Sequence, residues 1–85
     1  MHDDNLIGQV RDIMAETFGI DETDLPDNPS QATFARWSSL LHMVLLVALE
    51  EHFNVTFAMD EMTSMTSLDR ILDVIRSKEG AGLAA

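Results

Sequence analysis

The chain of 85 residues contains no cysteine and few basic residues. Without cysteine it has no disulfide bonds, no thiolate metal site and no cysteine nucleophile. Five Lys and Arg stand against fifteen Asp and Glu, which gives a formal net charge of −10. Such a surface repels phosphate backbones and anionic lipid headgroups, so the composition argues against nucleic-acid and peripheral-membrane roles. It favours partners with basic surfaces.

Long hydrophobic runs are also missing. The longest hydrophobic stretch extends from Met43 to Leu49 and is too short to cross a bilayer. The chain opens on the polar stretch His2-Asp3-Asp4-Asn5 and lacks the basic start of a signal peptide. We therefore expect a cytoplasmic protein without membrane insertion. The hydrophobic content of 46% is nevertheless sufficient for a folded core.

The hydrophobic pattern predicts helices. Apolar residues recur at helical spacing from Leu6 to Phe18, and Gly19 is a suitable stop. Residues 21–35 contain both prolines and are expected to form a long loop, which Phe34 and Trp37 pin onto the core. Further helices are expected at 38–53, at 60–65, and from a capped start at Thr66 and Asp69 to Gly80. The predicted fold is all-α, a small four-helix bundle with three longer helices and one short helix. Residues 1–80 are expected to form this single domain, and residues 81–85 a flexible C-terminal tail.

The helix expected at 38–53 is apolar nearly all round. On a helical wheel one apolar sector contains Leu45, Leu46, Leu49 and Phe53, and a nearly opposite sector contains Leu40, Met43, Val44 and Val47, with Glu51 among them. A helix of this kind is normally buried on all sides, but three other helices, one of them very short, cannot surround it. We therefore expect the second sector to be an exposed contact surface. Core packing of this sector and homodimerisation through it are the alternatives.

The sequence contains no recognisable catalytic or metal-binding motif. The histidines lack metal-ligand spacing, and the glycines form neither a nucleophile elbow nor a phosphate loop. His42 is expected to be buried and hydrogen-bonded. The acidic residues from Asp21 to Asp27 lack the glycine and terminal glutamate of a calcium loop, and are interpreted as a solvated loop. We expect a protein that is not an enzyme and binds no metal.

Two adjacent serines open this same helix. Serine is a favoured N-cap, because its hydroxyl accepts a hydrogen bond from an unpaired backbone N–H. If Ser38 caps the helix, Ser39 lies in the first turn, where its hydroxyl can point outward. A phosphate ester there would be favoured by the positive end of the helix dipole, by roughly 0.3–1 kcal/mol.

The segments Trp37 to Met43 (WSSLLHM) and Ala48 to Phe53 (ALEEHF) resemble the acyl carrier protein family. They are similar to the W-D-S-L-x-H-(L/M) and A-L-E-E-x-F motifs of free-standing carriers, and the resemblance covers about residues 4–77. It implies a four-helix bundle in which Ser39 receives a 4′-phosphopantetheine arm from coenzyme A. The thiol of the arm would hold an acyl group as a thioester, for fatty acid-like, polyketide or other specialised biosynthesis.

The resemblance also implies partners. These are a phosphopantetheinyl transferase and the enzymes that load and process the acyl group, with basic or apolar docking surfaces. The residues expected to meet them are Ser38, Leu40, Met43, Val44, Val47 and Glu51. Since Leu41 and Val44 are apolar where family members often carry charges, we expect docking to rely more on hydrophobic contact and less on charge pairing than in the carriers of fatty acid synthesis. Glu50, Glu51 and the net charge of −10 still favour a basic partner surface. The chain is expected to be monomeric.

One residue departs from the family pattern, because Ser38 stands where aspartate is usual. The two residues are nearly equal as helix caps, so the fold should not change. The lost charge next to Ser39 leaves three outcomes open, namely slower modification, a dedicated transferase, or no modification. Without modification the chain would be an interaction module. A further alternative is an aminoacyl or peptidyl carrier, which has the same arm but a different cargo.

The methionines admit two interpretations. Met59, Met62 and Met65 are spaced by three and, as flexible gap-fillers, are expected in the core. The alternative is that some of them, with Met43, line a pliable cleft for an acyl chain.

Overall fold

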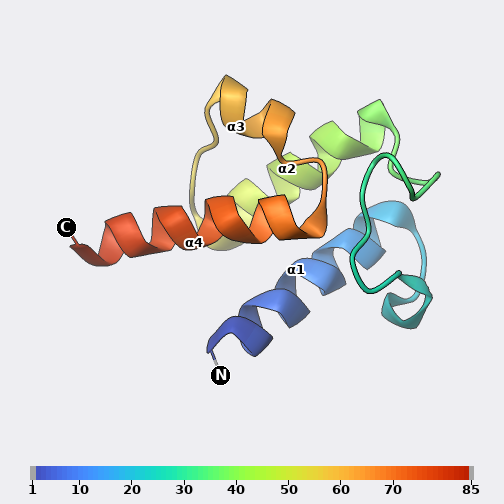
Figure 1. Cartoon of the computed structure of the whole chain (residues 1–85), viewed down its shortest axis with the longest axis horizontal. Coiled ribbons are helices and arrows are strands. Elements are labelled where there is room, and N and C mark those ends of the chain that lie inside the picture. The colour runs from blue at the N-terminus through green and yellow to red at the C-terminus, as the bar shows by residue number, and fades with distance from the viewer. Residues whose placement is uncertain (1, 85) are drawn as a thin grey trace.

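The computed structural model describes residues 2–84, and the side chains of residues 5–78. The elements are α1 (His2–Phe18), the short 3-10 helix η1 (Glu22–Asp24), α2 (Ser39–Phe53), α3 (Met59–Ser64) and α4 (Leu68–Ala84). In Figure 1 the short α3 stands at the top of the view, apart from the long helices α1 and α4 below it. The predicted all-α fold is confirmed. No helix in the described part of the chain is long and apolar enough to cross a membrane.

The core lies where α1 packs against α2 and α4. Each of the three contributes side chains that are almost completely withdrawn from solvent: Val10 and Met14 from α1, Leu45, Leu46 and Leu49 from α2, and Ile71 and Ile75 from α4. Burying one such side chain stabilises the fold by about 1.5–3 kcal/mol. The sector of α2 predicted to face inward therefore does so.

The helix stop expected at Gly19 is confirmed, and α2 ends in a similar way at Asn54. At the end of α1, Gly19 has a φ of 70°, and the Ile20 N–H donates to the Ala15 carbonyl at 3.0 Å. This is a Schellman motif, which uses a left-handed residue to satisfy the last carbonyls of a helix. Asn54 ends α2 in the same way, with a φ of 55° and a Val55 N–H bond to the Glu50 carbonyl at 3.1 Å.

The expected bounds of the last helix were wrong at both ends. The Ser67 hydroxyl, not Thr66, accepts from the Arg70 N–H at 3.3 Å, in the position of an N-cap. At the other end α4 continues beyond Gly80 to Ala84. A helical glycine costs only about 1 kcal/mol relative to alanine, and the alanines and leucine that follow are good helix formers. The flexible tail at 81–85 remains a prediction, and Ala85 lies outside the described residues.

The long α1–α2 loop is fixed at several places. Its aromatic side chains pack on the end of α1, with the rings of Phe34 and Trp37 centred 5.4 and 5.6 Å from that of Phe18. This confirms the pinning expected from the sequence. Its middle pairs with the α3–α4 connector, where the Gln31 N–H donates to the Thr66 carbonyl at 2.9 Å. The loop thus brings the start of α2 to a defined position beside the end of α1 (Figure 1).

Candidate functional site

Ser38 caps α2, as the sequence predicts. It has an extended backbone, and its hydroxyl accepts from the Leu41 N–H at 3.2 Å. Its carbonyl accepts from the His42 N–H at 2.8 Å. The serine therefore performs the structural task of the aspartate that is usual at this position, because either side chain supplies the oxygen that a helix N-terminus needs.

Ser39 is the first residue of α2 and is exposed to solvent. Its hydroxyl has no hydrogen bond to any side chain or backbone group within residues 5–78. Because Ser38 already caps the helix, the fold does not require this second hydroxyl. It stands at the positive end of the helix dipole, where a phosphate group is electrostatically favoured.

Next to Ser39 begins a row of exposed hydrophobic side chains on α2. Leu40 is 73% exposed, Met43 50%, Val44 47% and Val47 50%. We call these four residues the α2 apolar face. The prediction that this sector stays exposed in the monomer is confirmed. Adjoining exposed apolar side chains of this kind are typical of contact sites in soluble proteins.

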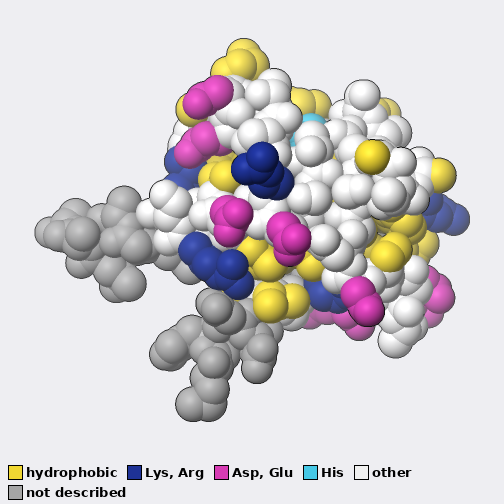
Figure 2. Space-filling view, in the orientation of Figure 1, with side chains coloured by type: hydrophobic (Ala, Val, Ile, Leu, Met, Phe, Trp, Pro, Cys, Tyr) yellow, Lys and Arg dark blue, Asp and Glu magenta, His cyan; other side chains and the backbone are white. Residues whose placement is uncertain are grey.

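The two acidic residues of α2, Glu50 and Glu51, differ in their exposure to solvent. The Glu50 carboxylate is turned inward, where it accepts from the Phe57 N–H at 2.8 Å. This leaves Glu51 as the exposed acidic side chain of the helix. On α4, by contrast, acidic and basic side chains lie next to one another (Figure 2), as in the pair Asp73 and Arg76. The α2 apolar face is therefore chemically distinct from the α4 surface.

His42 is buried and hydrogen-bonded, as expected, with 9% of its surface exposed. Its Nδ1 accepts from the Trp37 indole N–H at 3.0 Å. Its Nε2 lies 2.9 Å from the Met62 carbonyl oxygen in α3. The side chain thus connects the segment that precedes α2 with α3.

The methionines do not share one environment. Met65 is fully buried and Met62 is partly buried against the core, which agrees with the packing interpretation. Met59 is 78% exposed, so its expected place in the core was wrong. A spacing of three advances about 300° on an α-helix, so residues six apart lie about 120° from one another and do not share a face.

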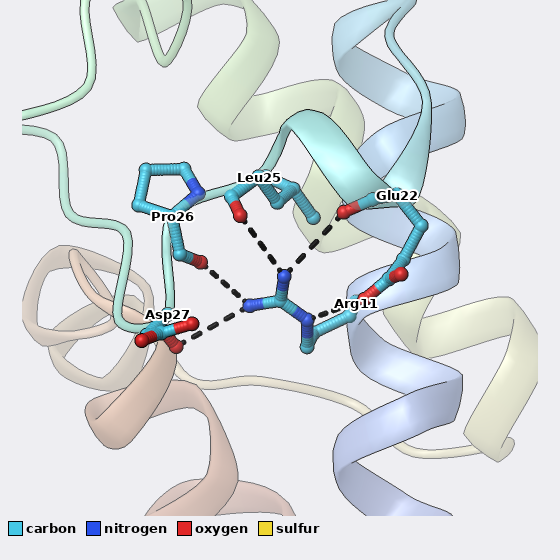
Figure 3. A network of polar contacts seen from close by, with 5 residues as sticks. All are labelled: Arg11, Glu22, Leu25, Pro26 and Asp27. Atoms are coloured by element: carbon cyan, nitrogen blue, oxygen red, sulfur yellow. Dashed lines mark hydrogen bonds and ion pairs between the residues drawn. The ribbon is translucent and has the colours of Figure 1, made fainter.

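Arg11 is a structural residue that the sequence analysis did not identify. Its guanidinium donates to the backbone carbonyls of Glu22, Leu25, Pro26 and Asp27, and to the Glu22 carboxylate at 2.7 Å (Figure 3). The loop was interpreted as solvated and acidic. The side chains of Asp21, Asp24 and Asp27 are indeed exposed, but the loop backbone encloses a cation. A signal was present in the sequence, since Arg11 is the only Lys or Arg before Arg36.

Comparison with known proteins identifies the family of this chain. Residues 8–75 match the family described as the phosphopantetheine attachment site. The chain is also similar to "Polyketide-8 synthase acyl carrier protein 2" of Streptomyces avermitilis, with 29% identity over 72 residues, which cover 85% of this chain and 83% of that protein. The matched range contains the loop, the cap and the whole of α2. The chain therefore belongs to the phosphopantetheine-attachment family, as an acyl carrier protein whose prosthetic group is 4′-phosphopantetheine.

Proposed function

We propose that Ser39 is the residue to which the 4′-phosphopantetheine arm is attached. The observation that carries this proposal is the division of work between the two serines at the start of α2. The Ser38 hydroxyl caps the helix at 3.2 Å from the Leu41 nitrogen, whereas the Ser39 hydroxyl is exposed. An incoming transferase therefore meets a hydroxyl that it can modify without uncapping α2.

The site fits a phosphate ester. The Ser39 oxygen forms a phosphodiester with the arm, losing its proton as the adenosine bisphosphate part of coenzyme A leaves. The positive end of the α2 dipole favours the resulting negative charge by roughly 0.3–1 kcal/mol. The arm supplies the thiol that a cysteine-free chain lacks, and the acyl cargo is held there as a thioester. The chain itself provides attachment and recognition, and performs no chemistry.

The proposed partner surface is the α2 apolar face, together with Ser38 and Glu51 at its two ends. Its exposed hydrophobic side chains begin directly after the attachment residue, so an enzyme that reaches the arm also reaches Leu40 and Met43. The expected partners are a phosphopantetheinyl transferase and the enzymes that load and process the cargo. We place the protein in the cytoplasm as a monomer, serving polyketide, fatty acid-like or another specialised biosynthesis.

The attachment is tested by incubating the purified chain with coenzyme A and a broad-specificity phosphopantetheinyl transferase. Intact-mass spectrometry should show the addition of one arm to the wild type and to Ser77→Ala, which removes an exposed serine of α4. Ser39→Ala should gain nothing. If several transferases leave the wild type unchanged, the unmodified interaction module replaces this proposal.

A second measurement identifies the cargo. Mass spectrometry of the protein from its native host reports the arm and its load together. An acyl group supports the proposed role, whereas an amino acid or peptide on the arm would assign the chain to the aminoacyl or peptidyl carriers.

A further inference from the structure

His42 is a buried titratable side chain to which the proposed function gives no role. Both ring nitrogens have a partner, and the partners determine the tautomer. The Trp37 indole N–H can only donate, so Nδ1 accepts at 3.0 Å. The Met62 carbonyl can only accept, so Nε2 carries the proton and donates at 2.9 Å. The tautomer with its proton on Nε2 therefore satisfies both hydrogen bonds.

The bond at Nδ1 fixes the segment that leads to the attachment residue. Trp37 lies two residues before Ser39, and its indole packs on Phe18 at the end of α1. The bond to His42 ties this same indole to the first turn of α2. With the His42 N–H bond to the Ser38 carbonyl, one residue thus holds both the side chain before the cap and the cap itself.

The bond at Nε2 acts on a different element. Met62 lies in α3, which ends at Ser64, so its carbonyl is among the last four that no backbone N–H of the helix satisfies. The His42 N–H supplies the missing donor. Since α3 buries none of its residues completely, polar bonds of this kind add to the packing of Met62 in holding the helix in place.

We propose that His42 is a positioning residue with two separable tasks: its Nδ1 holds Trp37 so that Ser39 is presented correctly to the transferase, and its Nε2 fixes α3. The first task rests on the proposed attachment at Ser39, whereas the second does not. Neither task involves contact between the imidazole and the reacting atoms.

Two substitutions of His42 by amide side chains should separate its two tasks. In His42→Asn the amide oxygen occupies the place of Nδ1 and keeps an acceptor for Trp37, but no group reaches Met62. In His42→Gln the amide nitrogen approaches the place of Nε2 and keeps the donor for Met62, but the acceptor for Trp37 is lost. Trp37→Phe removes the same bond from its other end and retains an aromatic ring against Phe18.

The readouts are the KM and kcat of arm addition for each apo protein, and the hydrogen exchange of the Met65 amide, which bonds to the Glu61 carbonyl at the end of α3. His42→Gln and Trp37→Phe should raise KM by about fivefold, the factor that corresponds to one lost buried hydrogen bond, with kcat nearly unchanged. His42→Asn should keep the wild-type KM and exchange the Met65 amide faster. Circular dichroism verifies that each variant is folded. If His42→Gln does not fold, Trp37→Phe still tests the bond to Nδ1.

The outcomes distinguish the inference from the function on which it rests. A wild type that accepts no arm refutes attachment at Ser39, and the first task with it. In a second outcome the wild type accepts the arm while His42→Gln and Trp37→Phe keep the wild-type KM. This result would leave the attachment at Ser39 intact and overturn the positioning role of His42. An equal rise of KM in His42→Asn and His42→Gln would also overturn it, because His42 would then act only as a packed core residue.

Discussion

The Nη1 atom of Arg11 lies 2.6 Å from the carbonyl oxygen of Pro26, so a side chain of α1 determines the course of a loop that precedes α2. The same guanidinium reaches three further carbonyls, and the Arg11 side chain is only 14% exposed. A planar fork of N–H donors can satisfy several acceptors at once, which a lysine ammonium on a flexible stem does less well. The loop therefore depends on this guanidinium for its shape.

Arg11→Lys should lower the free energy of unfolding by about 1.5–3 kcal/mol, because hydrogen bonds from a charged guanidinium to the loop carbonyls are lost. Urea denaturation measures the change. Arg70→Lys is the matched control, since Arg70 is exposed on α4, and it should stay within about 0.5 kcal/mol of the wild type. Equal stability of the two variants would show that water replaces the guanidinium at no cost.

Substitutions on the two sides of α2 should separate docking from stability. Val47→Glu places a charge on the α2 apolar face and should change the free energy of unfolding by less than about 0.5 kcal/mol, since Val47 is 50% exposed. It should nevertheless slow transfer between the carrier and its partner enzymes. Leu49→Ala, at a fully buried position, should cost about 2–5 kcal/mol. Unfolding of Val47→Glu would place this face in the core, and unchanged transfer would remove it from the docking surface.

Docking through the α2 apolar face should depend only weakly on salt. Surface charges more than about 10 Å apart are screened in 0.1 M salt, whereas hydrophobic contact is not weakened by screening. Since Glu51 is the exposed acidic residue of α2, the KM for a partner enzyme should vary by less than about threefold between roughly 0.05 and 0.5 M NaCl. Glu51→Gln should have a similarly small effect. A steep rise of KM with salt would transfer the main role to the acidic residues outside α2.

The sequence was sufficient for features that arise within one element. The two apolar sectors of α2, the cap at Ser38 and the stop at Gly19 follow from helical periodicity and from local backbone preference, and all three are confirmed. It was insufficient where partners lie far apart in the chain. Neither periodicity nor propensity places the Arg11 guanidinium on the Pro26 carbonyl, or the His42 imidazole on the Met62 carbonyl, because both contacts depend on how separate elements pack.

The carboxylate of Glu61 joins α3 to α4, and this connection should depend on pH. The carboxylate accepts from the Ala58 N–H at 2.7 Å and lies 2.9 Å from the Lys78 ammonium. The Ala58 bond, and then the Lys78 pair, lower the pKa of Glu61 from its ordinary value of 4.5. A carboxyl whose pKa is lower in the folded state stabilises the fold fully above its ordinary pKa, and this stabilisation is lost as pH falls through the lowered value.

Glu61→Gln should therefore be less stable than the wild type at about pH 7, and the difference should shrink as the pH falls below about 4.5 and the wild-type carboxylate is protonated. Urea denaturation across this range measures it. Asp60→Asn removes the same charge from the neighbouring exposed residue, which lacks the bond to Lys78, and should affect stability less. A difference between Glu61→Gln and the wild type that stays constant from neutral to acidic pH would mean that the shape of this side chain, rather than its charge, holds α3 against α4.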